Sequence, residues 1–143
     1  MAEANLMLMI QQSIERRNQL QLDISNFHAQ KNLAAYAQAD TNSILSSEKA
    51  AIRDKFKNLY NNSPELQEEY TDYTEITEYE EEIDKITAQI QDELERLSAW
   101  ETSIDAQITT SSAELEEINA YLQSYQQMMT SNIQEDYNFG IGG

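Results

Sequence analysis

Apolar residues recur at heptad spacing through most of the C-terminal half of the chain. With d positions at residues 76, 83, 90, 97, 104, 111, 118 and 125, seven of the eight are apolar or aromatic. Five of the eight a positions, each four residues after a d position, are apolar as well. A heptad kept in one register over about seven repeats is typical of a long helix in a coiled coil. The pattern therefore predicts a long helix over residues 64–133.

The N-terminal half has a less regular pattern. The stretch Asp40-Thr41-Asn42-Ser43 has low helix propensity and separates two apolar stripes. One stripe comprises Leu6, Ile10, Leu20, Ile24 and Phe27, and the other comprises Ile44 or Leu45, Ile52, Phe56 and Leu59. We therefore predict that residues 3–60 are helical and form two pieces, 3–39 and 44–60, that meet at a kink.

A break at Asn61-Asn62-Ser63-Pro64 separates the two halves. Ser63 suits the N-cap of a helix, and Pro64 suits its first position. We expect a turn at residues 61–63 that folds the halves into an antiparallel hairpin, followed after the long helix by a non-helical tail at residues 137–143. The predicted fold is all-α, with a single helical domain over residues 1–143.

The composition excludes several fold and site classes. The chain has no Val and no Cys, one Pro and one His, and its three Gly all lie in the last four positions. A β-sandwich, a β-barrel, a Rossmann unit and a P-loop all need residues that are missing here. The commonest zinc sites and Cys/His nucleophile pairs are also excluded. We expect no enzymatic activity, no catalytic or metal-binding residue and no cofactor.

The charge is strongly negative and unevenly distributed. Nine basic and 26 acidic residues give −17, and residues 64–143 hold two basic and 20 acidic residues. A polyanion is repelled by nucleic acid and by anionic membranes, so we expect neither as a partner. No apolar run approaches the ~20 residues of a membrane span. The first ten residues do not resemble a Sec-type signal peptide, so the chain is expected to be cytoplasmic or exported without a cleaved signal.

The hairpin would also bring opposite charges together near the turn. Residues 65–84 contain ten acidic residues and no basic one, whereas Lys49, Arg53, Lys55 and Lys57 lie just before the turn. Exposed ion pairs contribute about 0.2–1 kcal/mol each, so their main effect is on the register of the two helices.

The apolar stripe is too wide for two helices alone. The g positions Tyr79, Ile86, Trp100 and Tyr121 extend it beyond the a and d positions. A face of this width needs a third or fourth helix, which must come from other copies of the chain or from another helical protein. We therefore predict a multi-helix bundle whose interface contains Ile76, Ile83, Ile86, Ile90, Leu94, Leu97, Trp100, Glu101, Ile104, Ile108, Leu115, Ile118, Leu122, Tyr125 and Met129.

Glu101 is the most unusual member of this predicted interface. A carboxylate at an a position is costly unless it is paired, and a paired one can fix the register of a bundle. A hairpin folded at residue 62 places residue 101 nearest residue 23. A pair with Arg17 or Lys31 would then require either a shift of this register or a neighbouring subunit, and we favour the neighbouring subunit. The alternative is that Glu101 reaches outward to solvent.

Three other groups suggest chemistry only weakly. The carboxylates of residues 78–84 lack the spacing of a calcium-binding loop, which favours a solvated acidic face over a cation site. His28 has no cluster of partners, so a surface or interface role is favoured. Tyr70, Tyr73 and Tyr79 are candidate modification sites, with simple packing favoured.

The composition resembles that of exported bacterial axial proteins. These are flagellar rod, hook and filament-end proteins and the subunits of type III secretion needles or filaments. The shared features are the absence of Cys, one Trp, one Pro, 25 Asn plus Gln, and terminal helices that can pair as a hairpin. ESX-type secreted hairpins expect Trp-x-Gly at the turn. Here Trp100 is followed by Glu101 and Thr102, which sets that family aside.

The resulting functional hypothesis is a structural protein that assembles with itself into a filament, a tube or another homopolymer. The alternative is a cytoplasmic adaptor or export chaperone that binds a partner helix as a small closed oligomer. Contact geometry separates the two, because open heterologous contacts grow into filaments whereas isologous contacts close.

Overall fold

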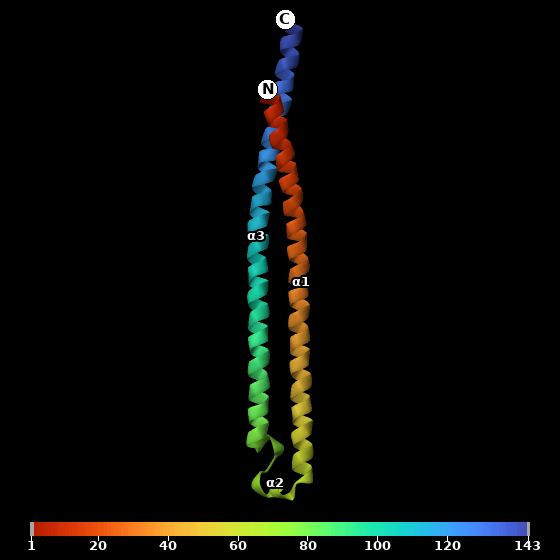
Figure 1. Ribbon diagram of the computed structural model, residues 1–143, viewed down its shortest axis with the longest axis vertical. Coiled ribbons are helices and arrows are strands. Elements are labelled where there is room, and N and C mark those ends of the chain that lie inside the picture. The colour runs from red at the N-terminus through yellow and green to blue at the C-terminus, as the bar shows by residue number, and fades with distance from the viewer. Residues whose placement is uncertain (1, 143) are drawn as a thin grey trace. The chain divides into compact units, whose positions relative to one another are not determined.

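The computed structural model describes the backbone of residues 2–142 and the side chains of residues 2–137. In chain order the elements are α1 (Ala2–Asn62), α2 (Pro64–Glu69), the 3₁₀ helix η1 (Tyr73–Glu75) and α3 (Thr77–Gly142). The long helices α1 and α3 pack against each other, and the described part of the chain contains no strand. The all-α prediction is therefore confirmed (Figure 1).

The chain packs as two compact units. Unit 1 combines Met1–Gln30 with Ser103–Gly143, and unit 2 is Lys31–Thr102. Each unit contains a segment of α1 and a segment of α3, while α2 and η1 belong to unit 2. The expectation of a single domain over residues 1–143 stays a prediction.

The helix α1 runs without interruption from Ala2 to Asn62. The predicted division into residues 3–39 and 44–60 is therefore wrong. No Gly or Pro lies within α1 to break it. The hydroxyl of Thr41 donates a hydrogen bond to the carbonyl of Ala37 at 2.7 Å, so this weak helix former is accommodated within the helix.

The buried face of α1 follows a heptad that its residue types conceal. From residue 3 to residue 45 its half-buried and buried positions include an unbroken alternation of three- and four-residue steps. Leu6 and Leu20 lie at such positions in unit 1, as Ala34 does in unit 2. Arg17, Lys31 and other polar residues occupy further positions of the same series. Hydrophobicity alone therefore made this half look irregular.

The connection between the long helices is longer than predicted. Ser63 accepts a hydrogen bond from the Leu66 amide and Pro64 begins α2, in agreement with the break expected there. However, α2 ends at Glu69, and α3 begins only at Thr77. The predicted turn at residues 61–63 and the helix starting at residue 64 are therefore wrong in extent.

Side-chain hydrogen bonds explain why the helix does not continue through residues 70–76. The carboxylate of Asp72 accepts a hydrogen bond from the Tyr73 amide at 2.8 Å, and the amide of Thr71 donates to the Glu75 carboxylate at 3.2 Å. Such local contacts compete with helical hydrogen bonding. They hold an extended segment and the short helix η1 in place of a longer α-helix.

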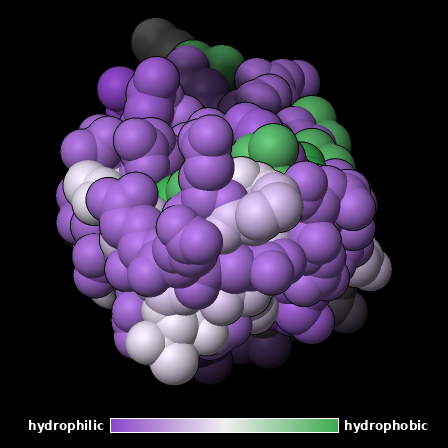
Figure 2. All heavy atoms as spheres, turned by 90° about the horizontal axis from the view of Figure 1, so that it is seen from below, coloured by the Kyte–Doolittle hydropathy of each residue, from purple (hydrophilic) through white to green (hydrophobic). Residues whose placement is uncertain are grey.

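Tyr60 fastens this connection to the end of α1. Its hydroxyl lies 3.0 Å from the carbonyl oxygen of Tyr70 and 2.9 Å from that of Thr71, and donates to them. The side-chain amide of Gln67 donates to the carbonyls of Tyr60 and Asn61 at the helix end, and the Tyr60 carbonyl also accepts from the Ser63 amide at 3.4 Å. Figure 2 looks onto this end of unit 2, where hydrophilic atoms dominate.

The C-terminal part of α3 is helical where the sequence predicted a non-helical tail. The helix extends to Gly142, so the non-helical tail predicted for residues 137–143 is wrong through residue 142, and residue 143 lies outside the described part. A Gly in a helix costs about 1 kcal/mol relative to Ala, which weakens a helix end without requiring it to stop.

We predict that Tyr60→Phe lowers the free energy of unfolding by about 1 kcal/mol, because it removes the donor to the Tyr70 and Thr71 carbonyls. Urea denaturation at a fixed protein concentration measures this. Tyr36→Phe is the control, since Tyr36 is 75% exposed. Equal stability of both variants and the parent would show that the Tyr60 hydroxyl does not hold the connection.

Candidate interaction surfaces

The predicted interface residues lie mainly where α3 faces α1 of the same chain. Fourteen of the fifteen are buried or half-buried, and Ile76, Ile104 and Leu122 are nearly inaccessible. The exception is Trp100, which is 40% exposed. Since the chain itself covers most of this set, a contact between copies through it stays a prediction.

The large exposed apolar residues point to other surfaces. Eight of the thirteen are on α1, and of these only Ile44 and Leu59 belong to the predicted apolar stripes. No sequence signal would have found the other six, because the seam of α1 is recognised only from its packing. In unit 1 they are Met7, Leu8, Met9, Leu22, Tyr121, Met128, Ile133 and Tyr137; in unit 2 they are Leu33, Tyr36, Ile44, Leu59 and Trp100.

An apolar groove of about 860 Å³ lies in unit 1. It is formed along the first turns of α1 and closed on one side by Met129 of α3. Its lining includes Met7, Leu8, Ile10 and Ile14, and Glu15 is its one charged residue. A groove with this lining suits an apolar helix face more than a charged ligand.

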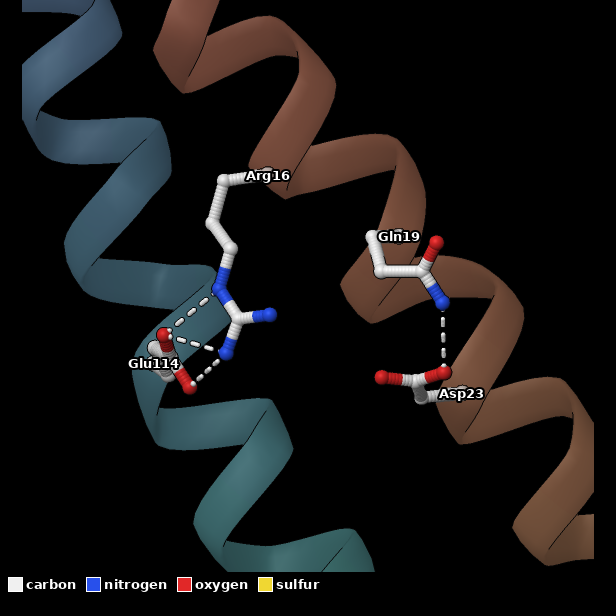
Figure 3. Close-up of polar contacts among 4 residues, drawn as sticks. All are labelled: Arg16, Gln19, Asp23 and Glu114. Carbon is white, nitrogen blue, oxygen red and sulfur yellow. Dashed lines mark hydrogen bonds and ion pairs between the residues drawn. The ribbon is translucent and has the colours of Figure 1, made fainter.

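A second feature of unit 1 is the ion pair between Arg16 and Glu114. The guanidinium makes two hydrogen bonds to the carboxylate, of 2.8 and 2.9 Å, so the contact is bidentate (Figure 3). On the same stretch of α1, Gln19 donates to Asp23 at 2.9 Å. Both side chains of the ion pair are more than a third exposed, so it contributes at most about 1 kcal/mol and acts mainly on register.

Glu101 has a partner in its own chain that the sequence did not indicate. Its carboxylate accepts a hydrogen bond from the side-chain amide of Gln38 at 3.0 Å, in a half-buried position of unit 2. The expected register, with residue 101 nearest residue 23, is therefore wrong by 15 residues. The cause is the long connection through α2 and η1, which moves the fold-back point along the chain.

Arg17 and Lys31, the expected partners of Glu101, lie on the buried face of α1. Arg17 donates to the side-chain oxygen of Asn18 at 3.4 Å, while its Nε is buried without a hydrogen-bond partner among the described residues. An intersubunit pair of either residue with Glu101 stays a prediction. The Glu101 carboxylate already accepts a hydrogen bond from Gln38, so it depends less on a cation from a neighbouring subunit.

The expected pairing of basic and acidic segments near the turn is represented by Lys55 and Glu82. Their side chains lie 3.0 Å apart on the surface of unit 2. The ammonium of Lys55 also lies 5.2 Å from the centre of the Phe56 ring, and that of Lys57 lies 5.6 Å from the Tyr73 ring. These contacts place the cations beside the connection.

The structure adds no support for a chemical role of the acidic residues 78–84, His28 or the three tyrosines. Within residues 2–142, no three acidic or His side chains come together as possible metal ligands. His28 is exposed. Tyr73 and Tyr79 pack edge to face with ring centres 5.5 Å apart, and Tyr79 also contacts Phe56 at 5.6 Å, consistent with a packing role.

None of the described helices has an apolar stretch long enough to cross a membrane.

Two pKa values in unit 1 are raised. A hydrogen bond with the Asp136 carboxyl, together with its like charge, raises the pKa of Glu3. The hydroxyl of Tyr121 donates to Glu117 at 2.6 Å, which raises the pKa of Tyr121. In both cases the protonated form supplies the hydrogen bond.

Comparison with protein families, with curated proteins and with solved structures finds no match for this chain. What the chain does must therefore be inferred from its own surfaces. The most informative ones are the exposed apolar residues of both units and the groove of unit 1.

We predict that Gln38→Leu lowers the free energy of unfolding by about 1–3 kcal/mol, because the half-buried Glu101 carboxylate loses its donor. Adding Glu101→Leu should restore that loss or raise stability further, since two apolar residues can replace a polar pair. Thermal and urea unfolding measure both effects. Gln89→Leu is the exposed control. Equal stability of Gln38→Leu and the parent would rule out a contribution from this contact.

We also predict that Asp136→Asn lowers the pKa of Glu3 toward its usual range, measured by carbon NMR titration of the carboxyl groups. Because the folded-state pKa is raised, the contact stabilises the fold in acid. Its contribution is lost as pH rises through that pKa. Asp92→Asn, an exposed change in unit 2, should leave Glu3 unaffected. An unchanged Glu3 titration in Asp136→Asn would contradict the pairing.

Proposed function

We propose that this protein is structural and that its activity is association with other copies of itself, as the helical-hairpin subunit of a filament, tube or other bundle. The supporting observation is the set of large apolar side chains that remain exposed after α1 and α3 have packed. Tyr36 is 75% exposed, and Met7 and Leu33 are each 61% exposed.

The apolar area is large enough to matter energetically. Burying a Leu or Met side chain that was fully exposed contributes about 1.5–3 kcal/mol, whereas association costs about 4–15 kcal/mol in lost freedom. The free energy gained by burying a few such residues per subunit therefore approaches the free-energy cost of association. Burying more of them exceeds that cost. Scattered single residues would not, so the proximity of exposed apolar residues along α1, at residues 7–9 and at residues 33 and 36, supports the proposal.

Charge opposes this association. Each subunit carries −17, and ten of the acidic residues lie in residues 65–84 of unit 2. Stacked subunits repel each other unless salt, divalent cations or protons screen or neutralise these groups. Assembly that involves unit 2 should therefore depend on ionic strength and pH.

We predict that the purified protein forms oligomers at micromolar concentration and that extended assemblies grow as salt is raised from about 0.05 M to about 0.5 M or as pH falls from 7.5 to 5. Sedimentation velocity, light scattering and electron microscopy measure this. Leu33→Glu with Tyr36→Glu should reduce the extended assemblies, because it removes two exposed apolar residues of one face.

Asn32→Glu is the matched control, since it adds a charge at an exposed neighbouring position and removes no apolar side chain. A parent protein that stays a folded monomer under all these conditions would refute the proposal. A small closed oligomer that never extends would favour the adaptor or chaperone alternative over a polymer.

A further inference from the structure

We infer that the first contact between two copies is made by two uncharged segments of unit 1, residues 4–14 and 118–134, each chain using the same surface. This inference rests on the proposed self-association and adds where it begins. Three observations carry it: the distribution of charge, the distribution of exposed apolar residues, and the groove along the start of α1.

Charge is absent from two segments that meet in unit 1. Residues 4–14 contain no charged residue, and neither do residues 118–134, in a chain whose charged fraction is 24%. The two segments lie beside each other, because Met9 and Ser13 form one small groove together with Ile118 and Tyr125. A chain of net charge −17 therefore has a neutral region at which copies can approach with little repulsion.

The same two segments concentrate the exposed apolar residues. Their 28 positions contain six of the thirteen large exposed apolar residues of the described chain: Met7, Leu8, Met9, Tyr121, Met128 and Ile133. Three of these are Met, whose flexible side chain adapts to irregular surfaces and is frequent at interaction sites. The neutral region of unit 1 is thus also its most apolar region.

The groove of about 860 Å³ provides the shape for a helical contact. Of its lining residues, Met7 and Leu8 are more than half exposed, while Ile10 and Met129 are half-buried. In a two-fold pair, Met7 and Leu8 of one copy can pack against the groove of the other, and the reverse contact forms at the same time. Such an isologous contact closes on itself and produces a dimer.

A second copy fits this surface better than a partner of another kind. A basic protein would be attracted to the acidic residues 65–84 and would find no charge to pair with here. An anionic membrane would be repelled by the −17 charge of the chain. Residues 118–134 also include Gln123, Gln126, Gln127 and Gln134, which line a separate shallow groove of unit 1. Amide side chains both donate and accept hydrogen bonds, so identical surfaces can satisfy each other.

The test is the dissociation constant of the dimer, measured by sedimentation with the full-length chain. Leu8→Glu should weaken the dimer at least about tenfold, because it replaces an exposed apolar residue at the groove with a charge. Asn26→Glu is the control, since it adds the same charge at an exposed position of unit 1 outside the neutral segments. Circular dichroism should show equal helix content in all three proteins.

Salt provides an independent readout. A contact between uncharged surfaces should change its dissociation constant by less than about threefold between about 0.05 M and 0.5 M salt, whereas extended assembly through unit 2 should change strongly. Leu33→Glu with Tyr36→Glu should leave the dimer intact and suppress only the larger assemblies.

The outcomes separate this inference from the proposed function. If Leu8→Glu dimerises like the parent while Leu33→Glu with Tyr36→Glu does not, the inference is overturned and self-association stands. If the parent forms dimers that Leu8→Glu weakens but never larger assemblies, the inference stands and the polymer is refuted. A parent that is monomeric throughout overturns both.

Discussion

The packing of α1 against α3 is the contact on which the rest of this structure depends. A lone helix has no core of its own, and its stability comes from burying an apolar face against another element. Here that burial is modest, with Leu20 and Ile104 almost fully enclosed in unit 1 and Phe56 and Ile76 in unit 2. A two-helix arrangement covers only one face of each helix. The apolar residues on the remaining faces stay exposed, and they are the basis of the proposed self-association.

The connection through α2 and η1 determines which residues of unit 2 face each other. Asp72 and Glu75 bond to backbone amides and end the helical run, and Tyr60 ties the extended segment back to α1. The resulting register places Gln38 opposite Glu101. The carboxylate that looked like a determinant of subunit stagger is thus satisfied inside one chain. The contact of Glu101 with Gln38 therefore acts on the register of α1 against α3 within one chain, and no contact between subunits is needed to explain this carboxylate.

Charge is partitioned in a way that matches two kinds of contact. Residues 65–84 of unit 2 carry ten acidic groups, while residues 4–14 and 118–134 of unit 1 carry none. Repulsion between copies is therefore weaker at these two uncharged segments than along residues 65–84. In the proposed assembly, copies associate through the uncharged segments at low salt and through unit 2 only when its charge is screened.

The sequence by itself determined the helical class, the break at Ser63 and Pro64, and the face of α3 that packs, because each depends on local propensity or on periodicity within one helix. It did not determine the face of α1, because Arg17, Lys31 and Gln38 occupy seam positions that a hydrophobicity pattern cannot recognise. The sequence also did not predict where α2 ends, nor the hydrogen bonds that Tyr60 donates to the carbonyls of Tyr70 and Thr71. Only the tertiary structure decided the register and the exposed surface, since both depend on contacts between residues far apart in the chain.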